Sequence, residues 1–411
     1  MTATNAEHKH ERTHLKERAT AEMRHLADAT GKIVILDFIL GSTLIFFSFS
    51  VAGMPLATLA GMALALIGLT RKRKYQVPGM GLFIFLLLIG LAWVLFDSWF
   101  LADAPTGDVL RRAGRIFGVF IVAVCIANGR LNLKSIVLGM AFSSIVNVGA
   151  YYLGIAPDDY PGFLTGWIND KNVSGLYYAT IAILLFAIVQ KRAYQLMIFL
   201  IFTLILWQTG SRTSLAAFAF AILWLIFAWR LNLFFKVILA VIMVRAVNFI
   251  EANFAQVGAF SDRSDTDLLR ADIDAASLAK INASPWNGLG LGQAMVHVRE
   301  RDFFFHNSFW TLLVEGGWLY LLLIVGATVY AAFLMKQKHR QQRVLYGEAA
   351  VVLLVICAWR LGEVFLTMPW GLVMGLALSL CAVPKNASRF KKIEHEPESQ
   401  LRAIKAEETA P

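Results

Sequence analysis

Charged residues are scarce in this chain, and their scarcity excludes an ordinary soluble protein. Of the 411 residues, 16% are charged and 58% are hydrophobic, whereas a soluble domain carries roughly 25% charged residues and about half apolar ones. The apolar residues gather in runs of about 17 to 25 residues, the length that crosses a hydrocarbon core. We therefore predict an all-α polytopic membrane protein.

Cysteine is also scarce, and a recognisable export signal is lacking. The three cysteines lie inside apolar runs, so the sequence indicates neither a disulfide framework nor a cysteine-based metal site. The net charge of +10 does not indicate nucleic acid as a partner, because the basic residues cluster in short turns between apolar runs. We expect no cleavable signal peptide, since the first apolar run begins near Ile33 after a charged leader. The histidines of this leader, residues 1–32, are expected to belong to a polar cytoplasmic tail rather than to a metal site.

The apolar runs predict about twelve transmembrane helices. Residues 33–249 hold the first nine spans and residues 308–384 hold the last three. The last run is short, and the run at 308–334 is long enough to tilt or to begin within the preceding loop. The predicted spans cover 33–51, 53–70, 80–100, 114–128, 135–155, 174–190, 194–210, 213–229, 232–249, 308–334, 347–367 and 370–384.

The charge of the turns predicts the orientation of these spans. Every second turn is basic, and the opposite turns are acidic or mixed, with Arg111 and Arg112 as an exception at the outer end of a span. The positive-inside rule places the basic turns in the cytoplasm, together with the leader and the basic tail at 385–411. Both termini are therefore predicted to be cytoplasmic. The basic turns hold Arg71 to Lys74, Arg130 and Lys134, Lys191 and Arg192, Arg230, and Lys336 to Arg340.

One long polar segment, residues 250–307, separates the ninth and tenth spans and is expected on the outer, periplasmic face. A loop longer than about 12–15 residues in a compact protein is usually functional or disordered. Its residues 265–281 are predicted to be helical, because apolar side chains recur there with a partial 3.6-residue period. Three alternating glycines at 288–292 indicate a tight turn and not a nucleotide-binding loop. The acidic cluster lacks calcium-loop spacing and indicates a solvated loop. The apolar stripe comprises Leu268, Leu269, Ile273, Ala276 and Leu278, and the cluster comprises Asp262, Asp265 and Asp267.

Two residues predicted at the outer face are candidates for chemistry. His306 follows three phenylalanines at the start of a span, where aromatic belts meet the interface. Such an imidazole can titrate near neutral pH and act as a base, or it can simply make one interfacial hydrogen bond. Arg212 lies in a short outward hairpin without a carboxylate nearby in the sequence. Its guanidinium suits bidentate phosphate binding, and snorkelling to the interface is the other interpretation.

Ionisable residues within apolar spans are costly and often mark function. Arg360 and Glu363 are three residues apart, and they most simply pair with each other on one helical face. Glu315 is followed by two glycines and is predicted to orient a partner or line a cavity. Asp37 and Asp97 lie nearer to span ends, from which they can reach the interface.

These motifs together resemble the O-antigen ligase and polymerase family, which includes bacterial O-oligosaccharyltransferases. The resemblance is carried by Ser211-Arg212-Thr213, by the long loop, and by His306-Asn307-Ser308 followed by Glu315-Gly316. It implies a metal-independent, inverting glycosyltransferase of the bacterial cytoplasmic membrane that needs no cofactor. Such an enzyme passes a glycan from undecaprenyl diphosphate to a hydroxyl of a lipid- or glycan-linked acceptor on the outer face.

The resemblance also implies roles for particular residues. His306 is expected to activate the acceptor, with Asn307 and Glu315 in support. Arg212 and one loop arginine are expected to hold the diphosphate. Arg270 is best placed as that loop arginine and Arg263 competes with it, because the tryptophan that often follows this arginine in the family is missing here.

Two alternatives remain open at the level of the sequence. A ligase and a polymerase of this family differ only in the acceptor, and no residue decides between them. A polysaccharide or lipid transporter, or a flippase, is the alternative from another class. Transporters often carry matching interrupted spans in two halves, and the sequence offers no such pair.

Overall fold

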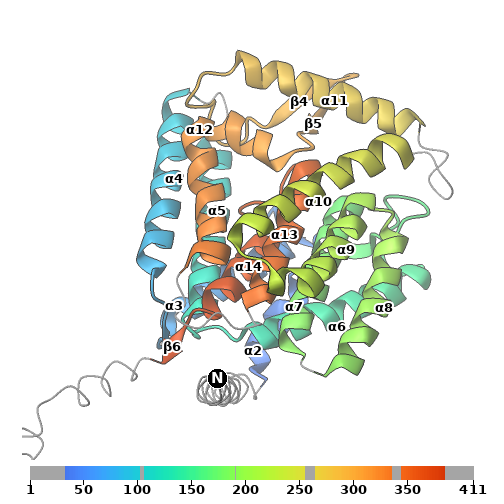
Figure 1. Ribbon diagram of the computed structural model, residues 1–411. Coiled ribbons are helices and arrows are strands. Elements are labelled where there is room, and N and C mark those ends of the chain that lie inside the picture. The colour runs from blue at the N-terminus through green and yellow to red at the C-terminus, as the bar shows by residue number, and fades with distance from the viewer. Residues whose placement is uncertain (1–32, 102–105, 190, 255–263, 336–343, 385–411) are drawn as a thin grey trace, which may run out of the picture.

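Helices dominate the structure, a computed structural model that describes residues 33–101, 106–189, 191–254, 264–335 and 344–384 (Figure 1). This confirms the predicted helical class. The leader, the tail, Asp262 and Arg263 lie outside the described residues, as does the predicted placement of both termini. The helices are α2 (Ile35–Thr43), α3 (Leu56–Thr70), α4 (Met80–Leu101), α5 (Thr106–Ala127), α6 (Leu133–Tyr152), α7 (Lys171–Ile188), α8 (Arg192–Thr209), α9 (Arg212–Phe227), α10 (Leu233–Phe254), α11 (Ser264–Ala283), α12 (Ser308–Val329), α13 (Val344–Arg360) and α14 (Met368–Ser379). Short antiparallel strand pairs join β1 (Ser50–Val51) to β2 (Met54–Pro55), β3 (Tyr75–Gln76) to β6 (Val383–Pro384), and β4 (Met295–Val298) to β5 (Arg301–Phe304).

Each predicted span overlaps one helix, but the helices differ in their capacity to cross a membrane. Six helices of the described chain are long and apolar enough: α4, α6, α7, α8, α9 with the 3-10 turn that follows it, and α12 with its π-helical extension. The nine residues of α2 and the twelve of α14 rise only about 14 and 18 Å at 1.5 Å per residue. That is short of a hydrocarbon core of roughly 30 Å. The number of about twelve crossings therefore stays a prediction.

Helix α5 begins earlier than the predicted span at 114–128. It starts at Thr106, so its first turns carry Arg111, Arg112 and Arg115. Arg111 and Arg112, the exception to the alternating charge of the turns, therefore belong to a helix. This matters for the site, because a helix directs residues three and four apart to the same face.

The end of the bundle opposite α11 holds basic residues and a buried carboxylate. Arg71 pairs with Asp37 at 2.7 Å and also donates a hydrogen bond to the carbonyl of Arg130 at 3.2 Å. Asp37 is fully buried, so the expectation that it reaches the interface is wrong. Near the other end of the bundle, Asp97 of α4 is buried as well and accepts a hydrogen bond from Asn287, which follows α11, at 3.0 Å. Both carboxylates therefore interact with a residue of another element, Asp37 through an ion pair and Asp97 through a hydrogen bond.

The segment between α10 and α12 folds as a helix and a hairpin that lie across one end of the bundle (Figure 1). The predicted helix at 265–281 is confirmed as α11. Its apolar stripe is only partly buried: Ile273 enters a small separate core with Val296 and Phe305. Leu268 and Leu278 are exposed, because α11 packs on the hairpin along a face narrower than the stripe.

A break in α12 is the feature of the fold that shapes the site. Gly316 and Gly317 leave helical geometry, and Gly317 has a φ of 65°. The carbonyl of Glu315 at this break accepts the N–H of Gly290 at 2.8 Å, and the carbonyl of Gly316 accepts the indole N–H of Trp93 at 3.0 Å. Carbonyl groups at a helix end otherwise lack partners, so the neighbouring loop and α4 together cap the break.

The glycines of that loop confirm the predicted tight turn. Gly288, Gly290 and Gly292 have φ angles of 96°, 94° and 87°, a region that side chains rarely adopt. A Cβ atom on Gly288 would lie 2.7 Å from the backbone of Glu315. The glycines therefore allow the loop to approach the broken helix closely enough to cap it.

Candidate functional site

His306 lies in the short connection between β5 and α12, and its neighbours on both sides are anchored. Asn307 is the N-cap of α12, and its side-chain oxygen accepts the N–H groups of Phe309 at 2.9 Å and Trp310 at 3.2 Å. Asparagine is a favoured residue at this position. Phe305, on the other side, is fully buried. The structure therefore gives Asn307 the role of fixing the backbone beside His306.

The surroundings of His306 keep its imidazole neutral. Burial, followed by the positive charge of Arg270, lowers the pKa of His306 to about 4, while the negative charge of Asp170 acts in the opposite direction. The pKa of His306 therefore lies below the neutral range predicted from the sequence. Its Nδ1 atom is buried, with no hydrogen-bond partner among the described residues. A neutral imidazole is the protonation state that a base requires.

Arg212 is the first residue of α9 and follows a tight hairpin closed by Gly210, whose φ is 63°. The side chain is half-buried. The hairpin packs against the first turns of α7, where a Cβ atom on Gly175 would lie 2.6 Å from the hydroxyl of Ser214. Arg212 is thus held at the end of the bundle where α7 begins.

The residue that caps the start of α7 lies within electrostatic reach of His306. Asp170 caps α7 by accepting the N–H groups of Asn172 and Val173 at 2.8 and 2.9 Å, and its charge acts on His306. Arg270 acts on the same imidazole from α11. Arg270 and Asp170 therefore lie within electrostatic reach of His306, and Arg212 begins α9 beside the start of α7.

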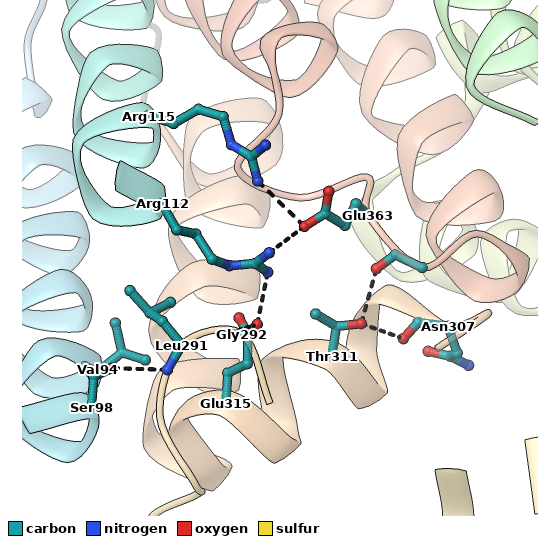
Figure 2. Close-up of polar contacts among 11 residues, drawn as sticks. Val94, Ser98, Arg112, Arg115, Leu291, Gly292, Asn307, Thr311, Glu315 and Glu363 are labelled. Atoms are coloured by element: carbon teal, nitrogen blue, oxygen red, sulfur yellow. Dashed lines mark hydrogen bonds and ion pairs between the residues drawn. The ribbon is translucent and has the colours of Figure 1, made fainter. Parts of the chain in front are cut away.

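A cluster of two arginines and two glutamates joins α5, α12 and the loop that follows α13 (Figure 2). Arg112 pairs with Glu315 at 2.7 Å and with Glu363 at 2.6 Å. Arg115, one turn along α5, reaches Glu363 at 3.5 Å. Glu315 is 2% exposed and also accepts the N–H of Gly292 at 3.0 Å. Glu315 therefore pairs with Arg112, and its supporting role in the site stays a prediction.

The predicted pairing of Arg360 with Glu363 rested on a shared helical face, and that premise is wrong. Helix α13 ends at Arg360, so Glu363 belongs to the following loop and turns toward α5 (Figure 2). Arg360 instead approaches Asp274 of α11 at 3.8 Å. Asp274 lies four positions after Arg270, so this contact ties α13 to the helix that carries the loop arginine.

The loop after α13 also packs directly on the backbone next to His306. A Cβ atom on Gly362 would lie only 1.7 Å from the carbonyl oxygen of Phe305. The hydroxyl of Ser308 donates to the carbonyl of Leu361 at 2.6 Å and accepts the N–H of Val364 at 2.8 Å. A small cavity lies between this loop, α5 and α12, and is lined by Arg112, Arg115, Ile116, Ser308, Thr311, Leu312, Glu315, Gly362, Glu363, Phe365, Leu366 and Thr367.

Sequence reasoning missed Arg112, Arg115 and Asp170 as residues of this region. A signal was available for the arginines, since basic residues at an otherwise acidic outer end contradict the positive-inside rule. Asp170 gave no signal beyond its position before an apolar run.

The fold and the site together define a class: a multi-pass helical membrane protein with a neutral histidine and several arginines gathered at one end. The O-antigen ligase family model matches residues 195–325, the segment that carries Arg212, Arg270, His306 and Glu315. An O-antigen ligase of Pseudomonas aeruginosa PAO1 is 27% identical over 324 residues, which are 76% of this chain and 79% of that protein. The resemblance to the O-antigen ligase family is therefore confirmed, and it indicates glycan transfer at a membrane in polysaccharide biosynthesis.

Proposed function

We propose that this protein is a ligase that moves a glycan from undecaprenyl diphosphate to an acceptor hydroxyl on the outer face of the bacterial cytoplasmic membrane. The observation that carries the proposal is a buried, neutral His306 within electrostatic reach of Arg270. A base next to a cationic group is the pair that such a transfer needs. A ligase is favoured over a polymerase because both the family model and the similar protein are O-antigen ligases.

Arg212 and Arg270 are the proposed ligands of the diphosphate, with Arg263 as a candidate in the same segment. A guanidinium binds phosphate oxygens through two parallel hydrogen bonds. Arg212 also stands at the first turn of α9, where the partial positive charge of a helix N-terminus favours an anion. As the glycosyl–phosphate bond breaks, the bond electrons stay on the diphosphate, and preorganised cations stabilise that charge. Two guanidinium groups can supply the positive charge without a metal ion.

His306 is the proposed base, and the donor itself prepares it. The positive charge of Arg270 contributes to the low pKa of His306. A bound diphosphate would compensate that charge and add negative charge nearby, which raises the pKa of His306 toward neutral. The imidazole then takes the proton of the acceptor hydroxyl while the acceptor oxygen bonds to the anomeric carbon. Attack opposite to the departing diphosphate inverts that centre.

Glu315 and Asn307 have supporting roles in this proposal. Asn307 fixes the start of α12 beside the base. Glu315 joins the loop that follows α11 to α5 through Gly292 and Arg112. Neither residue needs to touch the substrates in order to affect the rate, because a small displacement of a reacting group is costly.

The purified protein is expected to consume an undecaprenyl-diphosphate glycan and to release the free carrier diphosphate in the presence of a chelator. His306→Ala, Arg212→Ala and Arg270→Ala should each reduce turnover by about 100-fold or more. The matched controls are His297→Ala and Arg299→Ala, because both residues are exposed on the neighbouring hairpin and pair with the exposed carboxylates of Asp302 and Asp272. The controls should keep parental turnover.

Full activity of His306→Ala and Arg212→Ala would contradict the mechanism, and a strict need for added Mg²⁺ would contradict its independence of metal. The acceptor decides between the two activities. A ligase requires a separate acceptor, whereas a polymerase forms longer lipid-linked chains from the donor alone.

A further inference from the structure

The loop between α6 and α7, residues 153–170, presents aromatic rings and carboxylates on the surface. Tyr160 is 38% exposed, and Asp158 and Asp159 beside it are exposed. The ammonium group of Lys171 lies 5.7 Å from the centre of the Tyr160 ring and 5.2 Å from that of Phe163. The Tyr160 hydroxyl donates a hydrogen bond to Asp170 at 3.3 Å. The rings are thus oriented by charged neighbours.

This loop lies between the two halves of the proposed site. The N–H of Leu164 donates to the carbonyl of Gln208 at 2.9 Å, four residues before Arg212. At the other end of the loop, Asp170 is close enough for its charge to act on His306. The loop therefore runs beside the path from the proposed diphosphate ligand to the proposed base.

The inner part of the loop is firmly held, which makes its outer part a preorganised surface. The side chain of Asn147 donates to the carbonyl of Thr165 at 3.1 Å and accepts the N–H of Trp167 at 2.8 Å. The carbonyl of Trp167 accepts the N–H of Phe47 at 2.9 Å. A surface that is already ordered loses little conformational entropy when a ligand binds.

We propose that Tyr160 and Phe163, with Asp158, Asp159 and Asp170, form a subsite for a neutral sugar of the donor glycan, the one attached to the diphosphate. The aliphatic C–H face of a pyranose packs on an aromatic ring, and carboxylates accept hydrogen bonds from its hydroxyl groups. This inference rests on the proposed function. The sugar is bonded directly to the phosphate, so it must lie beside the ligand of that phosphate, where Leu164 anchors the loop.

The charge of the loop determines which sugars fit. The segment from Asp158 to Lys171 carries three carboxylates and one ammonium group, so a uronic acid at this position would meet like charge, which is unfavourable at an interface. The subsite is expected to prefer neutral hexoses and to discriminate against acidic ones. An aromatic belt at the bilayer surface would show no such preference between sugars.

The test measures donor and acceptor kinetics separately. The donor is undecaprenyl diphosphate that carries a single neutral hexose, and the competing probe is undecaprenyl diphosphate without sugar. Tyr160→Leu should raise the donor KM about 3- to 10-fold, by the loss of one aromatic contact, and leave inhibition by the bare carrier unchanged. Tyr160→Phe keeps the ring and should raise the donor KM less than Tyr160→Leu does. Asp158→Asn/Asp159→Asn should narrow the difference in kcat/KM between a neutral donor and a uronic acid donor.

The matched control is Tyr194→Leu, because Lys191 lies 5.8 Å over that ring at the opposite end of α8. It should change none of these constants. An unchanged donor KM in Tyr160→Leu, an equal loss of bare-carrier binding, or a rise confined to the acceptor KM would each overturn the subsite. Failure of the proposed function is distinguishable, because it would appear as full activity of Arg212→Ala.

Discussion

The pair formed by Arg112 and Glu315 allows a quantitative prediction. Arg112→Met removes the cation from a carboxylate that is 2% exposed and lies 2.7 Å away. Removing one partner of a buried ion pair costs about 3–5 kcal/mol, since the remaining charge stays buried. The hydrogen bond from Gly292 to Glu315 persists in this variant, so we expect a loss near the lower value, about 3 kcal/mol. Glu363 also loses Arg112, but it is 35% exposed and keeps Arg115 nearby, so it adds little to this loss of stability.

The double variant Arg112→Met/Glu315→Met tests the reason for this loss. Apolar side chains of similar size often replace a buried ion pair at little cost, and only the acceptor for the N–H of Gly292 is then missing. We expect the double variant to recover at least half of the stability that the single variant loses. Thermal unfolding in detergent, followed by circular dichroism, measures both variants against the parent.

The control for this prediction lies on the same helix. Arg111 pairs with Asp108 at 3.5 Å, and both side chains are about 60% exposed. Arg111→Met should therefore cost less than about 1 kcal/mol, as is usual for a surface pair. Equal stability of Arg112→Met and Arg111→Met would refute the reasoning, and so would a double variant as unstable as Arg112→Met alone.

Two further predictions concern the break in α12 and the pH dependence. Gly317→Ala should destabilise the protein by at least about 1–2 kcal/mol, because the new Cβ atom would lie 2.0 Å from the carbonyl of Trp286 at a φ of 65°. Gly326→Ala in the same helix meets no atom within 4 Å and should unfold at or above the parental temperature. Neutral His306 is the active form, so kcat/KM should fall as the pH drops through about 4. Arg270→Gln removes a charge that lowers this pKa, so its residual activity should fall at a higher pH; an unshifted profile would argue against the coupling.

Much of the helix pattern could be predicted from the sequence, because hydropathy is a local property. The turn at 288–292 was equally accessible, since glycine at alternate positions indicates a backbone that side chains avoid. The start of α5 was missed for the opposite reason. Hydropathy places the start of this span after Arg111 and Arg112. The helix itself begins before them, because partners such as Glu315 lie opposite Arg112.

The candidate residues also divide into those that have a local signal in the sequence and those that depend on distant contacts. Arg212 and His306 stand beside recognisable local motifs and could be selected from the sequence. The pairing of Arg360 with Glu363 was wrong because helix α13 ends between them. Glu363 instead meets Arg112, 251 positions away in the chain. No local pattern predicts a contact at that separation.

The sequence by itself determined that the protein is helical and apolar, that it has one polar segment late in the chain, and that it resembles O-antigen ligases. These features depend on residue types and short spacings. Only the tertiary structure decided the environment of His306, because burial and the charges of Arg270 and Asp170 reach it from different elements. It also decided the partner of Glu315. Charge–charge energies depend on distance and burial, and both are set by how the helices pack.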